Sequence, residues 1–237
     1  SDPLTLGLAL DKSLAKRIVG NGGVRTPWFR LVESLSDLDA IKSETIPFPL
    51  VVKPAFEGSS KGIRDSSKVE DWTAMERVVR SLVQDYRQPA LIEQFIPGRE
   101  ITVGVVGNKP PRIVGIMEVV PHTGLDDDFM YTIDVKRNWR DLVRYDCPPH
   151  MEASTLQAIE SQALLAYKAL GCRDVARMDF RVASDGQPHF LEANPLPGMG
   201  GYSDLPIMAG LQGWSFTQLV DAILSSAIER TRLERLS

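Results

Sequence analysis

Hydrophobic residues recur along the chain with two different periods. A helical period occurs in five segments, which are predicted helices: residues 8–19, 34–43, 69–84, 151–170 and 215–232. Apolar or alternating runs predict strands at residues 26–32, 49–55, 90–95, 100–106 and 112–120, and a hairpin at residues 175–193. Residues 121–150 follow neither period, and an irregular segment of this length is typical of an active-site loop. The pattern predicts an α+β fold with mostly antiparallel strands.

The predicted hairpin turns at residues 184–187, where Asp and Gly occupy the two central positions. If the first and last of these residues pair, Asp179 lies opposite Glu192 and Arg177 lies opposite Asn194. All four side chains then share one face, because alternate residues of a strand point the same way. The intervening positions of residues 176–182 are apolar, which fits a buried opposite face.

Two carboxylates at directly opposed positions of a hairpin repel one another unless a positive charge lies between them. Mg²⁺ fits such a gap, since it binds carboxylate oxygens and keeps its other coordination positions for water and phosphate. A solvated sheet face on which Arg177 and Arg181 neutralise Asp179 and Glu192 explains the same residues. The hairpin alone therefore leaves a metal site and a charged surface as alternatives.

Lysines and a glycine-containing loop are candidate phosphate ligands. Lys53 ends an apolar strand, and residues 57–62 (EGSSKG) follow with flexible backbone N–H groups and two hydroxyls. This loop lacks the Gly-Lys-Ser/Thr ending of a Walker A loop, and an ordinary turn explains it as well. Lys12 and Lys136 are equally compatible with surface positions. Residues 93–100 form a crossing that could offer backbone groups to a purine and a carboxylate to ribose, although a plain connection between strands accounts for it.

Composition narrows the classes of function. The chain has 237 residues, with 27 Lys and Arg against 31 Asp and Glu, so its net charge of -4 gives no reason to expect nucleic acid as a partner. No apolar stretch approaches the roughly 18 residues of a membrane span, so we expect no membrane partner and a cytoplasmic location. Cys147 and Cys172 predict buried thiols rather than a disulfide framework. The chain begins at Ser1 without a methionine, so we expect a piece of a longer protein.

Six motifs in this order resemble the ATP-grasp fold and, within it, the D-alanine:D-alanine ligase family: LDK, VVKPAFEGSSKG, LIEQFIPGREITV, DVKRNW, ARMDF and FLEANPLPGMGGYS. The resemblance runs over nearly the whole chain. It implies two α+β subdomains whose antiparallel sheets clasp a nucleotide, with a lid subdomain at residues 1–95 and a metal-binding subdomain at residues 96–237. It also implies that an N-terminal domain of the family is missing from the chain.

The resemblance assigns roles to individual residues. Asp179, Glu192 and Asn194 would hold two Mg²⁺ ions, or Mn²⁺, between the phosphates of ATP. Arg177, Lys136 and Ser60 are the implied catalytic residues. The implied ATP-binding residues are Lys12, Lys53, Glu57, Gly58, Ser59, Ser60, Glu93, Gln94, Phe95, Ile96, Glu100, Lys136 and Leu191. Gly198 and Ser203 lie where the family positions its acceptor amino acid.

The implied reaction joins a carboxylate to an amine through an acyl phosphate. Two positions depart from the family: Arg137 replaces a usual aromatic residue, and Asp204 replaces a usual apolar one. We therefore expect both to line the substrate site, and we expect D-alanine not to be the best acceptor. Alternatives are a ligase for a different acceptor and a regulatory nucleotide-binding domain. The partners expected are small-molecule substrates, and a homodimer is possible for the full-length parent.

Overall fold

The structure is a computed structural model that describes residues 1–58 and 62–234. Its elements in chain order are α1 (Pro3–Leu10), α2 (Lys12–Asn21), β1 (Phe29–Val32), α3 (Asp37–Ile41), β2 (Leu50–Pro54), η1 (Asp65–Ser67), β3 (Lys68–Val69), α4 (Trp72–Arg80), η2 (Ser81–Asp85), β4 (Ala90–Gln94), β5 (Arg99–Val106), β6 (Arg112–Pro121), α5 (Ile133–Arg137), α6 (Trp139–Leu142), β7 (Val143–Asp146), α7 (Ala153–Ala169), β8 (Val175–Val182), β9 (Pro188–Asn194), α8 (Asp204–Leu211) and α9 (Phe216–Glu234). The predicted α+β class is confirmed, since every strand pair in the described residues is antiparallel.

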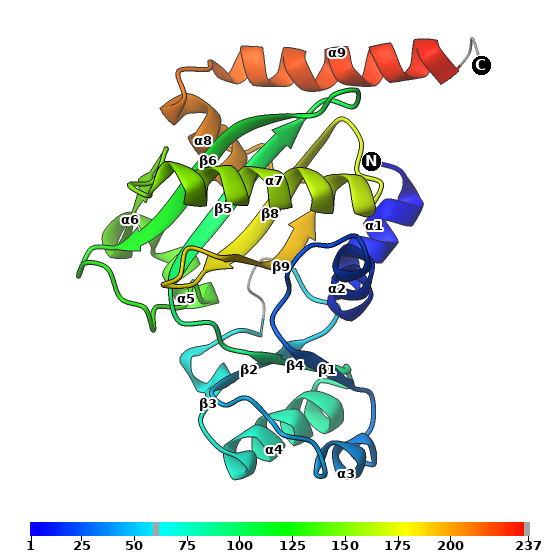
Figure 1. The fold of residues 1–237 in the computed structure, drawn as a ribbon, viewed down its shortest axis with the longest axis vertical. Helices are drawn as coiled ribbons and strands as arrows, with labels where there is room; N and C mark the ends of the chain where they lie inside the picture. The colour runs from blue at the N-terminus through cyan, green and yellow to red at the C-terminus, as the bar shows by residue number, and fades with distance from the viewer. Residues whose placement is uncertain (59–61, 235–237) are drawn as a thin grey trace.

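The strands form two sheets that lie one above the other (Figure 1). The smaller sheet has the order β1-β4-β2-β3, and α3 and α4 cover the face that lies away from the larger sheet. Buried side chains such as Val52, Met75 and Ile92 form the core between these helices and the sheet. The other face of the small sheet carries Lys53 and Glu93, so its charged side chains point toward the larger sheet.

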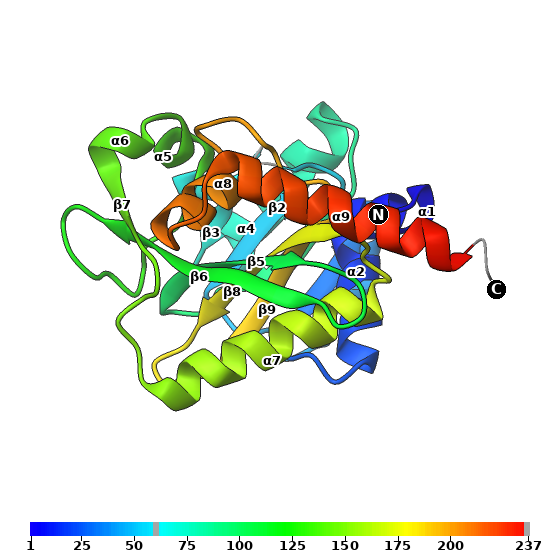
Figure 2. The same cartoon turned by 90° about the horizontal axis from the view of Figure 1, so that it is seen from above.

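The larger sheet has the order β7-β6-β5-β8-β9, and helix α7 lies across one of its faces (Figure 2). Met178 and Phe180 are fully buried in the core beneath α7, as the alternation of residues 176–182 predicts. Helices α8 and α9 pack near the far end of the sheet, around a smaller core that includes Leu205 and Leu219. The rest of the sheet face opposite α7 carries polar residues, which lie beside α8.

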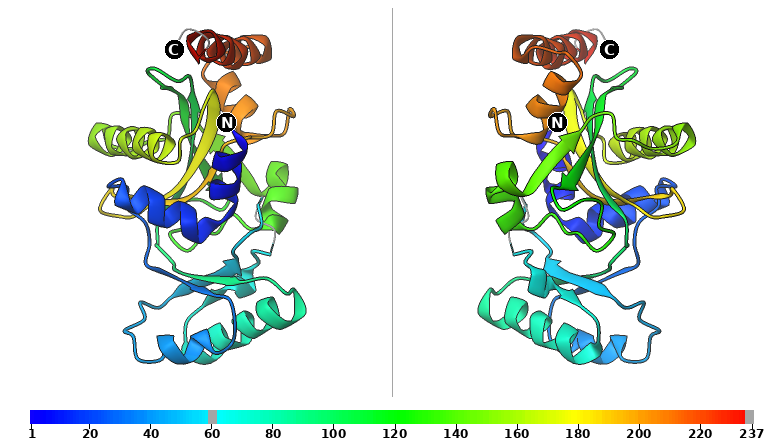
Figure 3. Two further views of the ribbon diagram at one scale, coloured as in Figure 1. Left: turned by 90° about the vertical axis from the view of Figure 1, so that its right-hand side faces the viewer. Right: turned by 90° about the vertical axis from the view of Figure 1, so that its left-hand side faces the viewer.

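Helices α1 and α2 lie along the β9 edge of the larger sheet, with α2 toward the smaller sheet (Figure 3), and Ala15 and Val19 join the core of the larger sheet. The prediction of one helix over residues 8–19 is wrong, because the chain breaks at Asp11. The Asp11 carboxylate accepts hydrogen bonds from the N–H groups of Ser13 and Leu14, both at 3.0 Å, and so begins a new helix. This break turns Lys12 and the rest of α2 toward the space between the sheets.

The β8–β9 hairpin has the predicted pairs Asp179–Glu192 and Arg177–Asn194, but the predicted turn is wrong. The N–H of Ala183 donates to the carbonyl of Gln187, so three residues rather than two form the loop. Phe180 consequently pairs with Phe190, and the register shifts by one residue before Asp179. A β-bulge at Leu191 thus cancels the error made at the turn.

Three further predictions need correction. The helix predicted over residues 69–84 begins only at Trp72, after the Asp71 cap, and passes into a π-helical turn at Ser81–Asp85. The segment 121–150 is not irregular throughout, because it contains α5, α6 and the edge strand β7. Helix α8 was not predicted. Of the two free cysteines, Cys172 is buried as expected and Cys147 is only half-buried.

None of the helices in residues 1–58 and 62–234 combines the length and the apolar character that a membrane crossing requires.

Candidate active site

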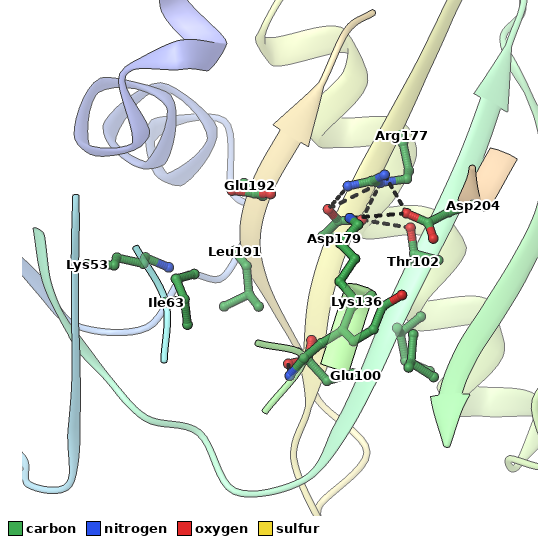
Figure 4. Close-up of a pocket in the computed structure, with 13 residues that line it drawn as sticks. Lys53, Ile63, Glu100, Thr102, Lys136, Arg177, Asp179, Leu191, Glu192 and Asp204 are labelled. Atoms are coloured by element: carbon green, nitrogen blue, oxygen red, sulfur yellow. Dashed lines mark hydrogen bonds and ion pairs between the residues drawn. The ribbon is translucent and has the colours of Figure 1, made fainter. Parts of the chain in front are cut away.

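A cavity of about 90 Å³ lies between the polar face of the larger sheet and β2 of the smaller one (Figure 4). Strands β5, β8 and β9 supply one wall, and α5 and the start of α8 supply another. Seven of its thirteen lining residues are charged: Lys53, Glu100, Lys136, Arg177, Asp179, Glu192 and Asp204. Residues far apart in the sequence therefore converge here, as the resemblance implies.

The two predicted carboxylates face this cavity side by side. Asp179 and Glu192 are directly opposed in the β8–β9 register, and the bulge directs Leu191 into the cavity as well. The hydroxyl of Thr102 on β5 donates to Asp179 Oδ1 at 2.7 Å. Burial acts to raise the pKa of Glu192, but the cations Lys12, Lys53 and Arg177 outweigh it, so the pKa is lowered. Glu192 therefore faces cations, among them the buried Arg177, that keep its pKa below the ordinary value.

Arg177 is the central cation of the site and is only 8% exposed. Its Nε and Nη2 donate to Asp179 at 2.9 Å and 2.8 Å, and its Nη1 donates to Asp204 at 2.5 Å. Burial acts to lower the pKa of Arg177, yet Asp179 and Asp204 together raise it above its ordinary value. The guanidinium is thus permanently charged and fixed beside the acid pair.

Glu93 bridges two buried lysines where the sheets meet. Its carboxylate lies 2.5 Å from Lys16 Nζ and 2.7 Å from Lys53 Nζ. Lys16 also donates to the carbonyl of Phe190 on the larger sheet, at 3.0 Å. Burial lowers the pKa of Lys16 to about 8, against the opposing effect of Glu93. For Lys53, burial also acts to lower the pKa, but Glu93 and Glu192 outweigh it and the pKa is raised.

Lys12 joins the loop after β2 to the acid pair. Its Nζ donates to the carbonyl of Glu57 and lies 3.3 Å from Glu192. These residues line a second cavity of about 210 Å³ on the other side of Glu192, together with Gly58 and Asn194. The two cavities therefore share Glu192, and lysines approach this carboxylate from both sides.

The predicted nucleotide edge lies at the crossing between the sheets. The N–H groups of Gln94 and Phe95 donate to the carbonyls of Trp28 and Pro49, at 2.8 Å and 2.9 Å. The buried Phe95 ring lies under Arg181, and Glu100 accepts a hydrogen bond from that arginine at 3.3 Å. Glu93 is turned to its two lysines and does not line the 90 Å³ cavity, whereas Glu100 does.

Arg181 also ties this crossing to the segment 121–150. Its Nε donates to the carbonyl of Ile96 at 2.9 Å, and its Nη2 donates to the carbonyl of Asp127 at the same distance. The carbonyl of Ile96 therefore already has a protein donor. The buried arginine holds the edge of the cavity against the segment that supplies Lys136.

The predicted substrate residues are only partly brought together. Arg137 follows Lys136 on α5 but is exposed and does not line the cavity. Gly198 is exposed, and a Cβ added there would lie 2.7 Å from Ser203 Oγ, so the two positions are adjacent. Asp204 points into the cavity. Ser59 and Ser60 lie outside the described residues.

Two glycines allow α8 to approach the larger sheet closely enough to deliver Asp204. A Cβ added to Gly104 would lie 2.6 Å from Leu205 Cδ1, and one added to Gly115 would lie 2.8 Å from Met208 Cγ. Glycine at both positions therefore permits helix α8 to pack directly on β5 and β6. The first residue of that helix then reaches Arg177.

Three residues of the site were not predicted from the sequence. Lys16 lies one helical turn after Lys12, so an i,i+4 spacing could have indicated it. Thr102 reaches Asp179 only because β5 pairs with β8, and no local pattern signals that pairing. Tyr131 lines the cavity, and its hydroxyl lies 2.8 Å from that of Tyr145. An aromatic side chain is thus present in the site, although Arg137 stands at the position where one was expected.

The donor set fits a divalent cation that binds with a nucleotide. In residues 1–58 and 62–234, no three His, Cys, Asp or Glu side chains are grouped to hold a metal ion by themselves. Mg²⁺ is rarely coordinated by protein side chains alone, since one or two carboxylates together with phosphate oxygens usually hold it. Asp179 and Glu192, with the amide of Asn194 next along β9, supply that smaller set.

We expect Mg·ATP to slow hydrogen exchange in the segment 121–150. This segment supplies Tyr131 and Lys136 to the cavity and contacts the small sheet through Asp128 and Lys68 at 2.9 Å. A bound phosphate would pair with Lys136 and hold the segment down. Amides of α7, on the opposite face, provide the control and should not change. Equal exchange of residues 131–137 with and without nucleotide would contradict the prediction.

Comparisons with known proteins give a consistent result. Residues 29–225 match the family model described as "D-ala D-ala ligase C-terminus". A D-alanine–D-alanine ligase of Pelotomaculum thermopropionicum is 35% identical over 99% of this chain and 73% of its own length. One from Bordetella petrii is 32% identical over 96% of this chain and 67% of its own length. The solved structure of a D-alanine–D-alanine ligase from Bacillus anthracis complexed with ATP has a TM-score of 0.76 and 25% identity, and covers 99% of this chain and 71% of that protein.

Proposed function

Because this chain belongs to the D-alanine:D-alanine ligase family, through the family's C-terminal region, we propose that it joins a carboxylate to an amine through an acyl phosphate formed from ATP. The observation that supports this best is the convergence of Asp179, Glu192, Arg177 and two lysines on one cavity. A solvated sheet face would leave these residues exposed, whereas Arg177 and Lys53 are buried.

The proposal assigns binding roles to the residues of the two cavities and of the crossing between the sheets. Asp179, Glu192 and Asn194 would hold two Mg²⁺ ions, or Mn²⁺, and bound metal would offset negative charge on the phosphoryl oxygens. Lys12, Lys53 and Lys136 pair with the phosphates of ATP, together with the loop at residues 57–62. Glu100 binds the ribose hydroxyls, and Leu191 borders the adenine together with Gln94, Phe95 and Ile96, whereas Glu93 stays with its two lysines. Gly198 and Ser203 lie at the acceptor.

The reaction takes two steps. An oxygen of the substrate carboxylate attacks the γ-phosphorus of ATP, and the bond from that phosphorus to the β-phosphate oxygen breaks, so that ADP leaves. The amine nitrogen then attacks the acyl carbon, loses a proton, and expels inorganic phosphate as the amide forms. Arg177 stabilises the charge that develops on the tetrahedral intermediate, because its guanidinium is already fixed beside the acid pair.

We also propose that the chain divides near residue 95 into a lid subdomain and a metal-binding subdomain. The separation of β1–β4 from β5–β9 into two sheets supports this division, although α1 and α2 pack on the second sheet. We propose a cytoplasmic location, which suits a reaction that consumes ATP.

The acyl phosphate can be trapped directly. We expect the chain, given Mg·ATP, a carboxylate substrate and hydroxylamine, to form ADP and a hydroxamate in equal amounts. D-alanine is the first carboxylate to test, because relatives are named for it. Reactions without the carboxylate or without Mg²⁺ are the controls and should form no hydroxamate. Tight binding of Mg·ATP with no hydroxamate from any amino acid would favour a regulatory nucleotide-binding domain instead.

A further inference from the structure

Asp204 holds an unusual position for a carboxylate in a site that receives anions. It is 5% exposed, begins helix α8, and lines the cavity. Its Oδ2 lies 2.5 Å from Arg177 Nη1 and 3.7 Å from Lys136 Nζ. The Asp204 carboxylate is therefore already paired with Arg177 and Lys136, the two cations that the proposed reaction uses beside the acyl group.

Arg177 has no nitrogen that is free of a carboxylate partner. Nε and Nη2 are engaged by Asp179, and Nη1 is engaged by Asp204. If a metal ion draws Asp179 away, Asp204 still holds Nη1. Nη1 carries a second N–H, but a substrate carboxylate that accepted a hydrogen bond from it would lie beside the buried Asp204 carboxylate and be repelled by it.

The charges that line the cavity also disfavour a substrate carboxylate beside Asp204. Its lining contains three cations, Lys53, Lys136 and Arg177, and four carboxylates, those of Glu100, Asp179, Glu192 and Asp204. The carboxylates are thus in excess before any substrate enters, and Asp204 supplies that excess. An additional carboxylate is disfavoured beside α8, whereas an ammonium group is favoured.

We infer that Asp204 is a specificity-determining residue, which excludes acceptors that carry a carboxylate beside the amine and favours acceptors without one, such as diamines. This inference rests on the proposed function, because it assigns the acceptor class of the same site. In a diamine, one nitrogen attacks the acyl phosphate while the second, protonated nitrogen pairs with the Asp204 carboxylate. An α-amino acid has no second cation, and its carboxylate would lie beside Asp204 where the diamine places its ammonium group.

Calorimetric titration of amines into the full chain with Mg·ADP and inorganic phosphate tests the inference. The probes are 1,3-diaminopropane and D-alanine, and the variant is Asp204→Asn, which keeps the size of the side chain. We expect the wild type to bind the diamine about tenfold more tightly than D-alanine, the scale of one hydrogen bond between charged groups. Asp204→Asn should abolish this preference.

Glu118→Gln is the matched control, because Glu118 is a buried carboxylate that pairs with Arg99 outside the cavity. It should keep the wild-type preference. A wild type that prefers D-alanine, a preference that survives in Asp204→Asn, or no binding of either amine would overturn the inference.

Titration of Mg·ATP alone and hydroxamate formation separate the two proposals. If the chain binds Mg·ATP and forms hydroxamate but shows no diamine preference, the proposed function stands and the role of Asp204 fails. If the chain binds no Mg·ATP, the proposed function fails first and the inference falls with it.

Discussion

Glu93→Gln is expected to lower the free energy of unfolding by about 3 to 5 kcal/mol, the cost of leaving buried charges without their partner. The glutamate is 3% exposed and is the counter-ion of two lysine ammonium groups, at 2.5 Å and 2.7 Å. The variant leaves Lys16 and Lys53 facing one another across a neutral amide. Urea unfolding at pH 7 measures the loss.

Lys16→Met should cost less than Glu93→Gln, since it leaves the neutral pair of Glu93 and Lys53. Lys42→Met is the surface control, because Lys42 forms an exposed pair with Asp39 and should change stability by about 0.5 kcal/mol or less. If Glu93→Gln costs no more than Lys42→Met, the bridge between the sheets carries no stability and this description of it is wrong.

The loss caused by Glu93→Gln should shrink as the pH rises. The pKa of Lys16 is about 8 in the folded chain, below the ordinary lysine value of 10.5, because burial disfavours the charged form. Between these values the unfolded chain binds more protons than the folded chain, so this group makes stability increase with pH. Removing Glu93 lowers the pKa of Lys16 below about 8, so the folded variant releases this proton at a lower pH than the wild type, and the loss should shrink most as the pH rises from 7 toward 8. An undiminished loss at pH 9 would indicate that Lys16 stays charged.

Local patterns were sufficient for most of the fold and failed where capping decides the outcome. The alternation of residues 176–182 identified the buried and polar faces of β8 correctly. The break at Asp11 was missed because the helical period continues across the capping carboxylate, and helix α8 was not predicted. The hairpin register was right at Asp179 only because a bulge at Leu191 offset a wrong turn.

The candidate site could be predicted where its residues share one hairpin, and not where they meet across sheets. The opposition of Asp179 and Glu192 was predicted from strand parity and an assumed two-residue turn, whereas their role as metal ligands came only from the resemblance. The Lys16–Glu93 pair joins α2 to β4, and Thr102 reaches Asp179 through the order of strands in the sheet. The i,i+4 spacing of Lys12 and Lys16 indicates the lysine but not its partner, and Thr102 has no local signal. The resemblance to the ATP-grasp ligases, confirmed by the family match, supplied the order that local patterns lacked.

Asp179→Asn and Glu192→Gln are each expected to weaken Mg²⁺-dependent ATP binding by about 1 to 3 kcal/mol, the scale of a lost charge-assisted contact. Both carboxylates line the cavity at directly opposed positions, and each lies within ion-pair distance of a cation, Arg177 for Asp179 and Lys12 for Glu192. Neutral amides of the same size keep the shape of the hairpin and remove the charge that a divalent cation requires. Without Mg²⁺, the same variants should bind ATP at least as well as the wild type, because they present less negative charge to the phosphates.

Calorimetric titration of ATP into the wild type, Asp179→Asn, Glu192→Gln and the control Glu118→Gln, with and without Mg²⁺, is the most direct test of the central claim. The account predicts that the wild type and the control bind ATP more tightly with Mg²⁺, and that both acid variants lose this gain. Equal Mg·ATP affinity in all four proteins, or wild-type binding that is indifferent to Mg²⁺, would contradict the assignment of this hairpin as the metal and nucleotide site.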